Sequence, residues 1–219
     1  MRGNTSKNKD LIEEIIKHNL LFVASSMNQN RWVLLKNDIR GPLFFDTSKI
    51  IAYPGLMQMI TQCAINVIKG DEIKFDLILG APYGGLPLSY FLAAALKTPC
   101  LTMRKEGIKK DGTMPTSAEI LGVFKKGDKV LIIEDAVLSA NTVIEFAQRL
   151  RKVGLEITDV LTMVDVGRSG AENLKAQNIR LHSLFTWKDL FDCYKELRSD
   201  RLSLEVKTYL EEMFKESRK

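Results

Sequence analysis

The sequence predicts an α/β fold in which a central, mainly parallel sheet is flanked by helices. Short apolar runs recur along the chain and alternate with amphipathic stretches of helical length. The runs are almost continuously apolar, which is typical of strands buried on both faces of a parallel sheet. Ligands bind such sheets at the carboxyl ends of the strands, so the residues that follow each run are the first candidates for a site.

The size and composition of the chain fit this fold class. The 219 residues are 45% hydrophobic and 27% charged, which is enough apolar material for one sizeable core. The formal net charge of +5 fits a polyanionic small-molecule ligand as well as an ordinary solvated surface. There is no dense basic tract interleaved with aromatics to indicate nucleic-acid binding. No apolar run is as long as a transmembrane helix.

The cysteines and histidines are scattered along the chain. Cys63, Cys100 and Cys193 form no CxxC pair, which predicts a reduced, cytoplasmic protein without a disulfide framework or zinc site. His18 and His182 are isolated, so we assign each a structural role rather than a metal-binding or catalytic one. Residues 1–10 are polar and lack the apolar segment of a signal peptide.

The first part of the chain predicts two helices and a hairpin. The predicted elements are a helix over 11–22, a strand over 31–36, a turn over 37–42, a strand over 43–46 and a helix over 55–69. The two strands are short and separated by a polar turn, so we expect them to pair with each other. Pro54 precedes the second helix, a position that proline favours.

The rest of the chain alternates strands with helices. Strands are predicted over 75–79, 99–103, 129–133, 159–164 and 180–184. Helices are predicted over 86–96, 141–153, 170–177 and 203–219. Residues 107–120 have no periodicity. A connection of this length inside a compact domain is usually functional or disordered.

The strongest local motif is KVLIIEDAVLSANT, which covers residues 129–142. An apolar strand ends in the carboxylates of Glu134 and Asp135, and a loop of small and polar residues leads into a helix. A helix N-terminus offers unpaired amides and a positive dipole end, which both favour phosphate. The carboxylates can accept hydrogen bonds from sugar hydroxyls or lie near a divalent metal. The motif suits a phosphorylated ribose, but Ser, Asn and Thr before a helix are also ordinary N-caps.

This motif resembles the phosphoribosyl-pyrophosphate (PRPP) signature of the type I phosphoribosyltransferases. The resemblance implies that Glu134 and Asp135 hold the ribose hydroxyls and that Asp135 favours positive charge on the ring. The loop that would bind the substrate consists of Ala136, Val137, Leu138, Ser139, Ala140, Asn141 and Thr142. Its part from Ser139 to Thr142 would hold the 5′-phosphate. Ala140 stands where the family has a glycine and Leu138 where it has a threonine, so the match is partial.

Further stretches narrow the resemblance to orotate phosphoribosyltransferase. GAPYGGLPL at 80–88 is similar to that family's pyrophosphate-binding loop, in which Tyr83 and Gly84 would contact the leaving group. The stretch that begins with Arg104 and Lys105 resembles the start of a mobile catalytic loop. Both basic side chains would help to neutralise pyrophosphate.

The same loop, expected at about 107–120, supplies the family's catalytic lysine. Lys109 matches that position best and Lys110 is its rival, while Asp111 stands where the family usually has histidine. In the family this loop enters the active site of the neighbouring subunit. The resemblance therefore implies a homodimer that shares the loop 104–112 across its interface.

The base pocket is implied by two further stretches. The segment that begins at Lys36 resembles the family's N-terminal hood, in which this lysine lies near the reacting centre and Phe44 and Phe45 border orotate. The family's arginine for the orotate carboxylate is replaced by Val166, and Arg168 is the candidate substitute. Arginine can bind a carboxylate in a bidentate way, which valine cannot do.

Taken whole, the resemblance implies one domain over 1–219 with the type I phosphoribosyltransferase fold, divided into an N-terminal helix and hood over 1–54 and a core over 55–219. It implies Mg²⁺-dependent transfer of phosphoribosyl from PRPP to orotate, giving orotidine monophosphate and pyrophosphate in pyrimidine nucleotide biosynthesis. Mg²⁺ would come with PRPP near Asp135, without a direct protein ligand. Two alternatives stay open: a different base, or a catalytically weak paralogue that acts as a binding or regulatory protein.

Overall fold

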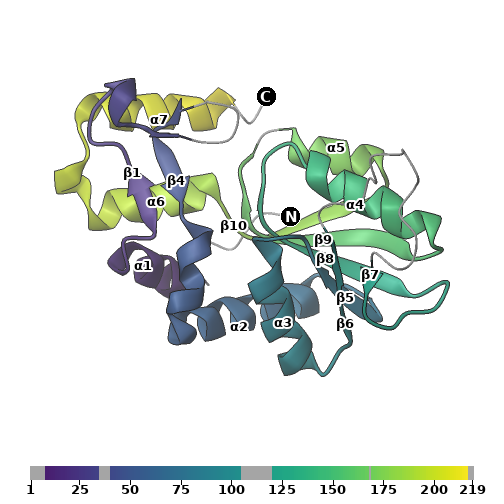
Figure 1. Cartoon of the computed structure of the whole chain (residues 1–219). Helices are drawn as coiled ribbons and strands as arrows, with labels where there is room; N and C mark the ends of the chain where they lie inside the picture. Colours follow the sequence, from purple (N-terminus) through teal and green to yellow (C-terminus); the bar gives the residue numbers. More distant parts are fainter. Residues whose placement is uncertain (1–7, 35–39, 105–119, 168, 217–219) are drawn as a thin grey trace. The chain divides into compact units, whose positions relative to one another are not determined.

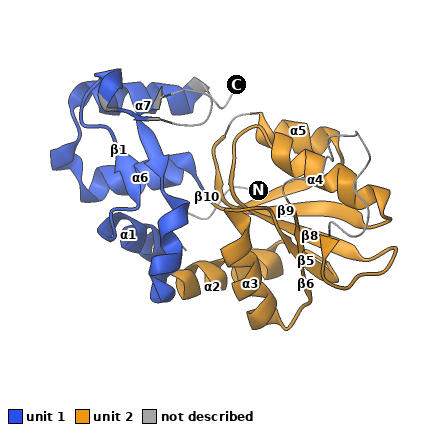
Figure 2. Ribbon diagram, viewed as in Figure 1, with its two compact units in different colours: residues 1–56, 185–219 blue, residues 57–184 orange. Residues whose placement is uncertain are grey.

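The chain divides into two compact units, which Figure 2 shows in different colours. The computed structural model describes residues 8–34, 40–104, 120–167 and 169–216. Unit 1 comprises residues 1–56 and 185–219, and unit 2 comprises residues 57–184. The division expected from the sequence differs, because it assigned 185–219 to the core. These residues instead pack with N-terminal elements, as the contact between the Phe45 and Phe185 rings illustrates.

Unit 2 is built around a six-stranded sheet with the order β10-β9-β8-β5-β6-β7 (Figure 1). The strands are β5 (Leu77–Gly80), β6 (Cys100–Met103), β7 (Ile120–Leu121), β8 (Lys129–Val137), β9 (Glu156–Asp165) and β10 (Arg180–Thr186). The pairs β5–β6, β5–β8 and β8–β9 are parallel, and β6–β7 is antiparallel. The predicted mainly parallel sheet is therefore confirmed.

Helices cover this sheet as the alternating pattern predicts. They are α2 (Pro54–Gly70), α3 (Gly85–Leu96), α4 (Asn141–Lys152) and α5 (Gly170–Ala176). α3 packs against β5 and β8, and α4 packs against β9. β8 is longer than its apolar run, because backbone pairing with β9 continues through the acids to Val137.

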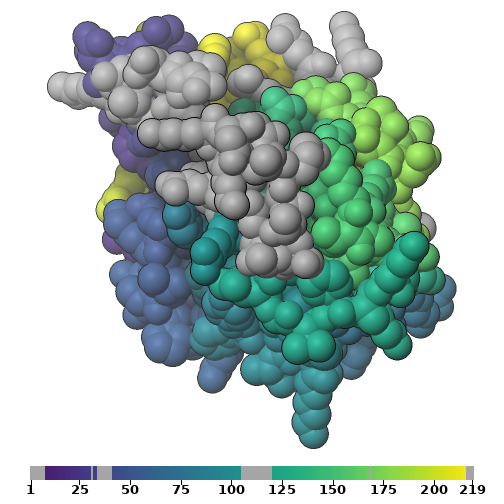
Figure 3. All heavy atoms as spheres, turned by 45° about the vertical axis from the view of Figure 1, so that its right-hand side comes forward, coloured from purple at the N-terminus to yellow at the C-terminus, as the bar shows by residue number. Residues whose placement is uncertain are grey.

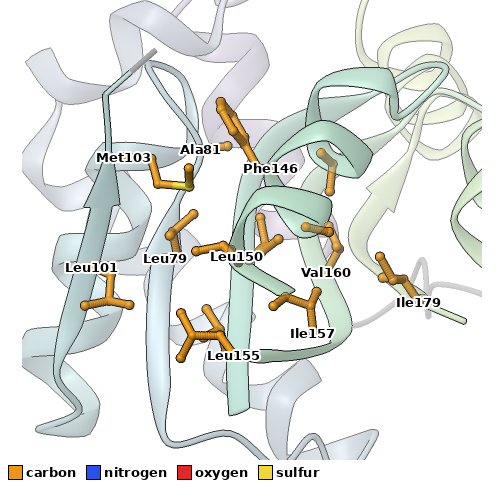
Figure 4. Close-up of a cluster of buried hydrophobic side chains, with 14 of the residues drawn as sticks. Leu79, Ala81, Leu101, Met103, Phe146, Leu150, Leu155, Ile157, Val160 and Ile179 are labelled. Carbon is orange, nitrogen blue, oxygen red and sulfur yellow. The ribbon is translucent and has the colours of Figure 1, made fainter. Parts of the chain in front are cut away.

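The main core of unit 2 lies between the sheet and α4. Leu79, Leu101 and Val160 come from three strands, and they pack with Phe146 and Leu150 of the helix (Figure 4). All five side chains are almost completely buried. Full burial of such a side chain contributes roughly 1.5–3 kcal/mol. This packing fixes the start of α4 relative to the ends of the strands.

Unit 1 consists of short strands and helices from both ends of the chain. Its elements are α1 (Lys9–Lys17), β1 (Leu21–Val23), η1 (Gln29–Arg31), β2 (Val33–Leu34), β3 (Arg40–Gly41), β4 (Leu43–Phe45), η3 (Thr47–Ala52), α6 (Trp187–Leu197), η5 (Ser199–Arg201) and α7 (Leu204–Glu216). No helix in the described ranges is long and apolar enough to span a membrane. No disulfide joins the cysteines.

Two predictions in unit 1 were wrong. Among the described residues, the segments 31–34 and 43–46 do not form the expected hairpin, because β2 pairs with β3 and β4 pairs with β1. The first helix ends at Lys17 rather than near Phe22, because Asn19 takes a left-handed conformation with φ 54°, which asparagine tolerates better than most residues. The residues after it are then available to pair as β1.

The sequence reading also missed α6. Its N-terminus is a capping box, in which the Thr186 hydroxyl accepts from the Asp189 amide and the Asp189 carboxylate accepts from the Thr186 amide. A Thr-x-x-Asp pattern before an apolar-periodic stretch is a recognised start signal. That signal was present in the sequence and would have predicted the helix.

Candidate active site

The acids at the end of β8 lie at the same sheet edge as the glycine-rich loop after β5. β5 and β8 are parallel neighbours, and their register pairs Gly80 with Ile133. The amide of Ala81 donates to the carbonyl of Ile133 over 2.9 Å. The two loops therefore leave the sheet together, at the edge where such folds bind ligands.

Two glycines allow the β5 loop to contact the acidic segment closely. A Cβ at Gly84 would overlap the carboxylate of Asp135, and a Cβ at Gly85 would overlap the carbonyl oxygen of Ile133. A side chain at either position would have to displace one of these groups, so the approach requires glycine. The structure thereby brings Gly84 and Asp135, two predicted site residues, into contact. Tyr83, beside them, is 71% exposed.

The two carboxylates have different surroundings. Glu134 is buried, and its Oε1 accepts a hydrogen bond from the amide of Asp135 over 3.0 Å. Asp135 is half-buried, and its Oδ1 accepts from the amide of Ala136 over 2.8 Å. Asp135 is therefore the acid more open to a ligand at this edge.

The loop between β8 and α4 turns at Ala140. This residue is the N-cap of α4 and has φ 61° and ψ 11°, the left-handed conformation, with no side-chain cap hydrogen bond. Glycine adopts this conformation without steric cost, which gives the physical reason for the family's glycine at this position. Ala140 adopts it as well, and its methyl group is buried in the core below α4.

The start of α4 has the properties of an anion site. Asn141 and Thr142 are exposed in its first turn, and Ser139 precedes them half-buried. The first amides of a helix have no intrahelical acceptor, and the helix dipole adds positive potential. The Ser139 carbonyl accepts from Asn173 Nδ2 over 3.0 Å, which ties the loop to α5. Leu138 is 45% exposed, so no core packing requires its apolar side chain.

The end of β9 borders the same loop and adds an acid, Asp165, to which the sequence analysis assigned no role in the site. Asp165 pairs with Val137, and the Val166 amide donates to the Val137 carbonyl over 3.0 Å. Burial raises the pKa of Asp165, while a 2.9 Å hydrogen bond from the Gly167 amide opposes that shift. The position of Asp165 directly after an apolar strand was the sequence signal for it.

The remaining predicted site residues fall into two groups. Lys36, Lys105, Lys109, Lys110, Asp111 and Arg168 lie outside the described residues. Arg104 is exposed one position after β6, and its carbonyl accepts from Arg149 Nη2 at 3.5 Å.

Phe44 and Phe45 belong to unit 1, where Phe45 is 5% exposed and packs on Phe185. Because neighbouring strand residues face opposite sides, Phe44 is the ring of this pair that is open to a ligand.

Comparison with known proteins identifies relatives of this chain. The phosphoribosyl transferase domain family matches residues 46–189. Uridine 5′-monophosphate synthase of Bos taurus is 38% identical over 153 residues, which are 70% of this chain and 31% of that protein. Orotate phosphoribosyltransferase of Caenorhabditis elegans is 32% identical over 158 residues, 72% of this chain and 68% of that protein. The chain thus spans about a third of the first relative's length and about two thirds of the second's.

Solved structures share the fold. UMP synthase of Leishmania donovani has a TM-score of 0.76 at 22% identity, covering 94% of this chain and 42% of that one. Orotate phosphoribosyltransferase from Aeropyrum pernix has a TM-score of 0.68 at 20% identity, covering 83% of this chain and 97% of that one. On the family match and the curated relatives, the chain belongs to the phosphoribosyl transferase domain family and, within it, to the orotate phosphoribosyltransferases.

Proposed function

We propose that the protein is an orotate phosphoribosyltransferase, which converts PRPP and orotate to orotidine monophosphate and pyrophosphate in pyrimidine nucleotide biosynthesis. The observation that carries the proposal is the contact between Gly84 and the Asp135 carboxylate at the sheet edge from which the loop into α4 departs. A hydrogen-bond acceptor and a helix N-terminus on one segment suit the hydroxyls and the phosphate of a ribose 5-phosphate. The names of the relatives support orotate as the base.

In the proposed reaction Asp135 acts on the ribose. Its half-exposed carboxylate accepts hydrogen bonds from the ribose hydroxyls. Its charge favours the positive charge that develops on the ring as the bond to pyrophosphate breaks. Glu134 holds the segment through its hydrogen bond to the Asp135 amide and assists in binding the hydroxyls. The amides and side chains of residues 139–142 hold the 5′-phosphate.

The leaving pyrophosphate is assigned to the other loops at the same edge. Tyr83 and Gly84 contact it from the β5 loop. Gly80 pairs with Thr102 in the parallel β5–β6 ladder, so Arg104 follows β6 at this edge too. Its guanidinium, with Lys105 and either Lys109 or Lys110, neutralises the departing charge. Lys36, Phe44 and Arg168 are assigned to the orotate pocket, and Phe45 to its packing support.

We also propose that Mg²⁺ accompanies PRPP near Asp135. In the described part of the chain no three acidic, histidine or cysteine side chains cluster to hold a metal ion. Mg²⁺ commonly binds through one or two carboxylates together with substrate phosphates. When bound, the ion supplies further neutralisation of the pyrophosphate. Asp135 is the protein carboxylate best placed to face it.

A homodimer is the proposed assembly, with the loop 104–112 shared between subunits. α3 has the sequence GLPLSYFLAAAL, which contains no charged residue. Tyr90 and Phe91 on it are 50% and 42% exposed, and Leu121 and Val123 near β7 are 44% and 88% exposed. The teal segments that include α3 and β7 lie at the surface in Figure 3. A helix that is apolar all round is normally covered, and a second copy would cover it.

Mixing two inactive variants tests the shared loop. Asp135→Asn and a Lys109→Ala/Lys110→Ala variant are each expected to be inactive. If the loop serves the neighbouring subunit, mixed dimers contain one intact site, and the mixture regains about a quarter of wild-type activity. A dimer that regains none would contradict sharing. A monomer by light scattering would contradict the assembly. The cytoplasmic location stays a prediction from the sequence.

A panel of bases tests the reaction itself. The protein is mixed with PRPP, Mg²⁺ and orotate, uracil, adenine, hypoxanthine or nicotinate, and pyrophosphate release is measured. Turnover with orotate supports the proposal. Turnover with another base and not with orotate would assign Leu138 and Val166 to a changed base pocket. No turnover by the folded protein would favour a binding or regulatory role instead.

A further inference from the structure

Unit 1 contains a cavity of about 290 Å³ that the proposed reaction does not use. One wall is apolar and is formed by Ile16 of α1 with Leu21 and Val23 of β1. The other wall carries Tyr194 of α6 with Arg198 and Arg201 around η5. Its volume is at the lower end of small-molecule sites, roughly 300 Å³ and above. The cavity therefore has the size of a ring-sized molecule rather than of a nucleotide.

The two arginines flank a short helical turn. Arg198 is the N-cap of the 3₁₀ helix η5, and Arg201 is its last residue, with its amide bonded to the Arg198 carbonyl over 3.0 Å. Both arginines line the cavity. Neither forms a salt bridge or side-chain hydrogen bond with another residue in the described ranges. Asp200 lies between the two arginines in the sequence and is a negative charge close to Tyr194.

Tyr194 adds a hydroxyl donor beside these cations. Its side chain is 8% exposed and lines the cavity. Burial raises the pKa of Tyr194 against the opposing attraction of Arg201 and Arg198, so the hydroxyl stays protonated at neutral pH. Within the described structure it has no hydrogen-bond partner, which leaves the proton available to an anionic oxygen.

The backbone of β1 supplies further donors on the opposite wall. β1 belongs to a two-stranded sheet with β4. The Leu20 carbonyl accepts from Asp46 and the Ala24 amide donates to Pro42, so even-numbered residues bond toward β4. In an antiparallel ladder the intervening residues, Leu21 and Val23, then direct their amides and carbonyls outward. This outer edge lines the cavity, and its polar groups need partners.

We propose that the cavity is a binding site for a small organic anion, a carboxylate or phosphate monoester on an apolar, ring-sized body. Arg198 and Arg201 bind the anionic group, because a guanidinium matches carboxylate and phosphate oxygens in a bidentate way. The Tyr194 hydroxyl donates to the same group. The apolar wall at Ile16 and Leu21 contacts the body of the ligand.

Calorimetric titration of the full chain tests the site with benzoate, phenyl phosphate, benzyl alcohol and inorganic phosphate as probes. Benzoate or phenyl phosphate is expected to bind saturably at one site, while benzyl alcohol does not bind. Inorganic phosphate is expected to bind more weakly than phenyl phosphate. Equal affinity for these two would overturn the assignment of the apolar wall. No saturable binding of either organic anion would overturn the site.

Variants test whether the organic anions bind in this cavity. Arg198→Ala/Arg201→Ala is expected to weaken binding about tenfold or more, since it removes charge-assisted hydrogen bonds. Lys74→Ala/Lys175→Ala removes the same charge from exposed positions of unit 2 and is expected to bind like the wild type. Arg201→Gln, at an exposed position, provides a milder variant if the double variant does not fold. Binding that survives the arginine changes but is displaced by PRPP and orotate would place the anion in the candidate active site and contradict the proposal.

Discussion

Two groups of acids in unit 2 have opposite surroundings. The His182 ring is held between Asp71 and Asp159, with both nitrogens 2.7 Å from a carboxylate oxygen. Arg180 and Thr158 bind the same Asp159 carboxylate, Nε of Arg180 over 2.8 Å and Oγ1 of Thr158 over 2.8 Å. This cluster satisfies its charges internally and agrees with the structural role expected for His182.

The acid pair at the end of β8 is arranged differently. The carboxylates of Glu134 and Asp135 each accept a hydrogen bond from the backbone amide of the next residue, and Gly84 packs on the second carboxylate. The pair lies at the carboxyl end of its strand, whereas Asp159 lies near the start of β9. Residue type alone therefore does not distinguish an acid held in an ion cluster from an acid that we propose to bind a ligand. Position along the strand separates the two groups here.

The largest expected effect comes from Asp135→Asn. The substitution keeps the shape of the side chain but removes the charge that, in the proposed reaction, favours a positive ribose ring. We expect kcat/KM to fall by about two to four orders of magnitude, with the free energy of unfolding nearly unchanged because the side chain is half-exposed. Steady-state kinetics and urea denaturation measure the two quantities. Glu156→Gln, an exposed acid at the start of β9, is the control. A variant with nearly full activity would sink the role of Asp135.

Asp159→Ala should show the opposite pattern. It breaks the buried pair of His182 with Asp159 and removes the ion-pair partner of Arg180, whose side chain is 62% exposed. Breaking a buried pair in this way typically costs about 3–5 kcal/mol. Urea denaturation measures the loss, and the exposed Glu156→Ala should change stability by less than about 0.5 kcal/mol. If the two variants were equally stable, the cluster would have no special stabilising role.

The pH dependence of stability follows from the same cluster. Burial alone would lower the pKa of His182, but hydrogen bonds to Asp159 and Asp71 outweigh it and raise that pKa. A raised folded-state pKa contributes stability that is present below the unfolded value of about 6.5 and is lost as pH rises through the folded value. The wild type should therefore lose stability from about pH 6 upward more steeply than His182→Gln. Equal pH slopes in chemical denaturation would contradict a charged His182.

At low pH the dependence of stability on pH has the opposite sign, because stability is lost as the pH falls. Burial raises the pKa of Asp159, but hydrogen bonds from His182, Arg180 and Thr158 outweigh it and lower that pKa to about 2. The lowered pKa of Asp159 contributes folding stability above the unfolded-state pKa of about 3.9. This stability is lost as the pH falls toward the folded-state pKa of about 2. His182→Gln should weaken this acid dependence, because it removes one of the three side-chain partners.

The smallest expected effect on stability is that of Ala140→Gly, in the loop between β8 and α4. Glycine relieves a left-handed conformation that costs roughly 1 kcal/mol in other residues. It also removes a buried methyl group worth about 0.8 kcal/mol, so the net change in stability should be below about 1 kcal/mol. Ala140→Val should be clearly less stable, since β-branched residues fit this conformation poorly. Thermal unfolding of both variants measures the difference, and a Val variant as stable as the Gly variant would contradict the observed backbone.

Much of unit 2 was predictable because its strands are buried on both faces. The runs that became β5 and the first half of β8 are apolar and buried at consecutive positions, and α4 has an amphipathic pattern. The acid pair was predictable for the same reason, since it directly follows such a run. Unit 1 was harder, because its strands are two or three residues long. Pairing between strands so short is decided by tertiary contacts rather than by local pattern.

The geometry of the site was less accessible from the sequence. The contact of Gly84 with Asp135 depends on the β5–β8 register, which joins segments far apart in the chain. The left-handed Ala140 was signalled by a resemblance to a glycine position, not by its own residue type. Phe45 was expected at a ligand and is packed on Phe185. An aromatic pair in a strand does not reveal which ring faces the core.

The central claim is that the edge at Asp135 transfers phosphoribosyl to orotate. The most direct measurement follows orotate consumption and pyrophosphate release together, in the presence of PRPP and Mg²⁺, for the wild type and for Asp135→Asn. We predict that the wild type releases pyrophosphate in step with orotate loss and that Asp135→Asn does so at least about a hundredfold more slowly. Pyrophosphate release that does not depend on orotate, or none from the folded wild type, would contradict the account.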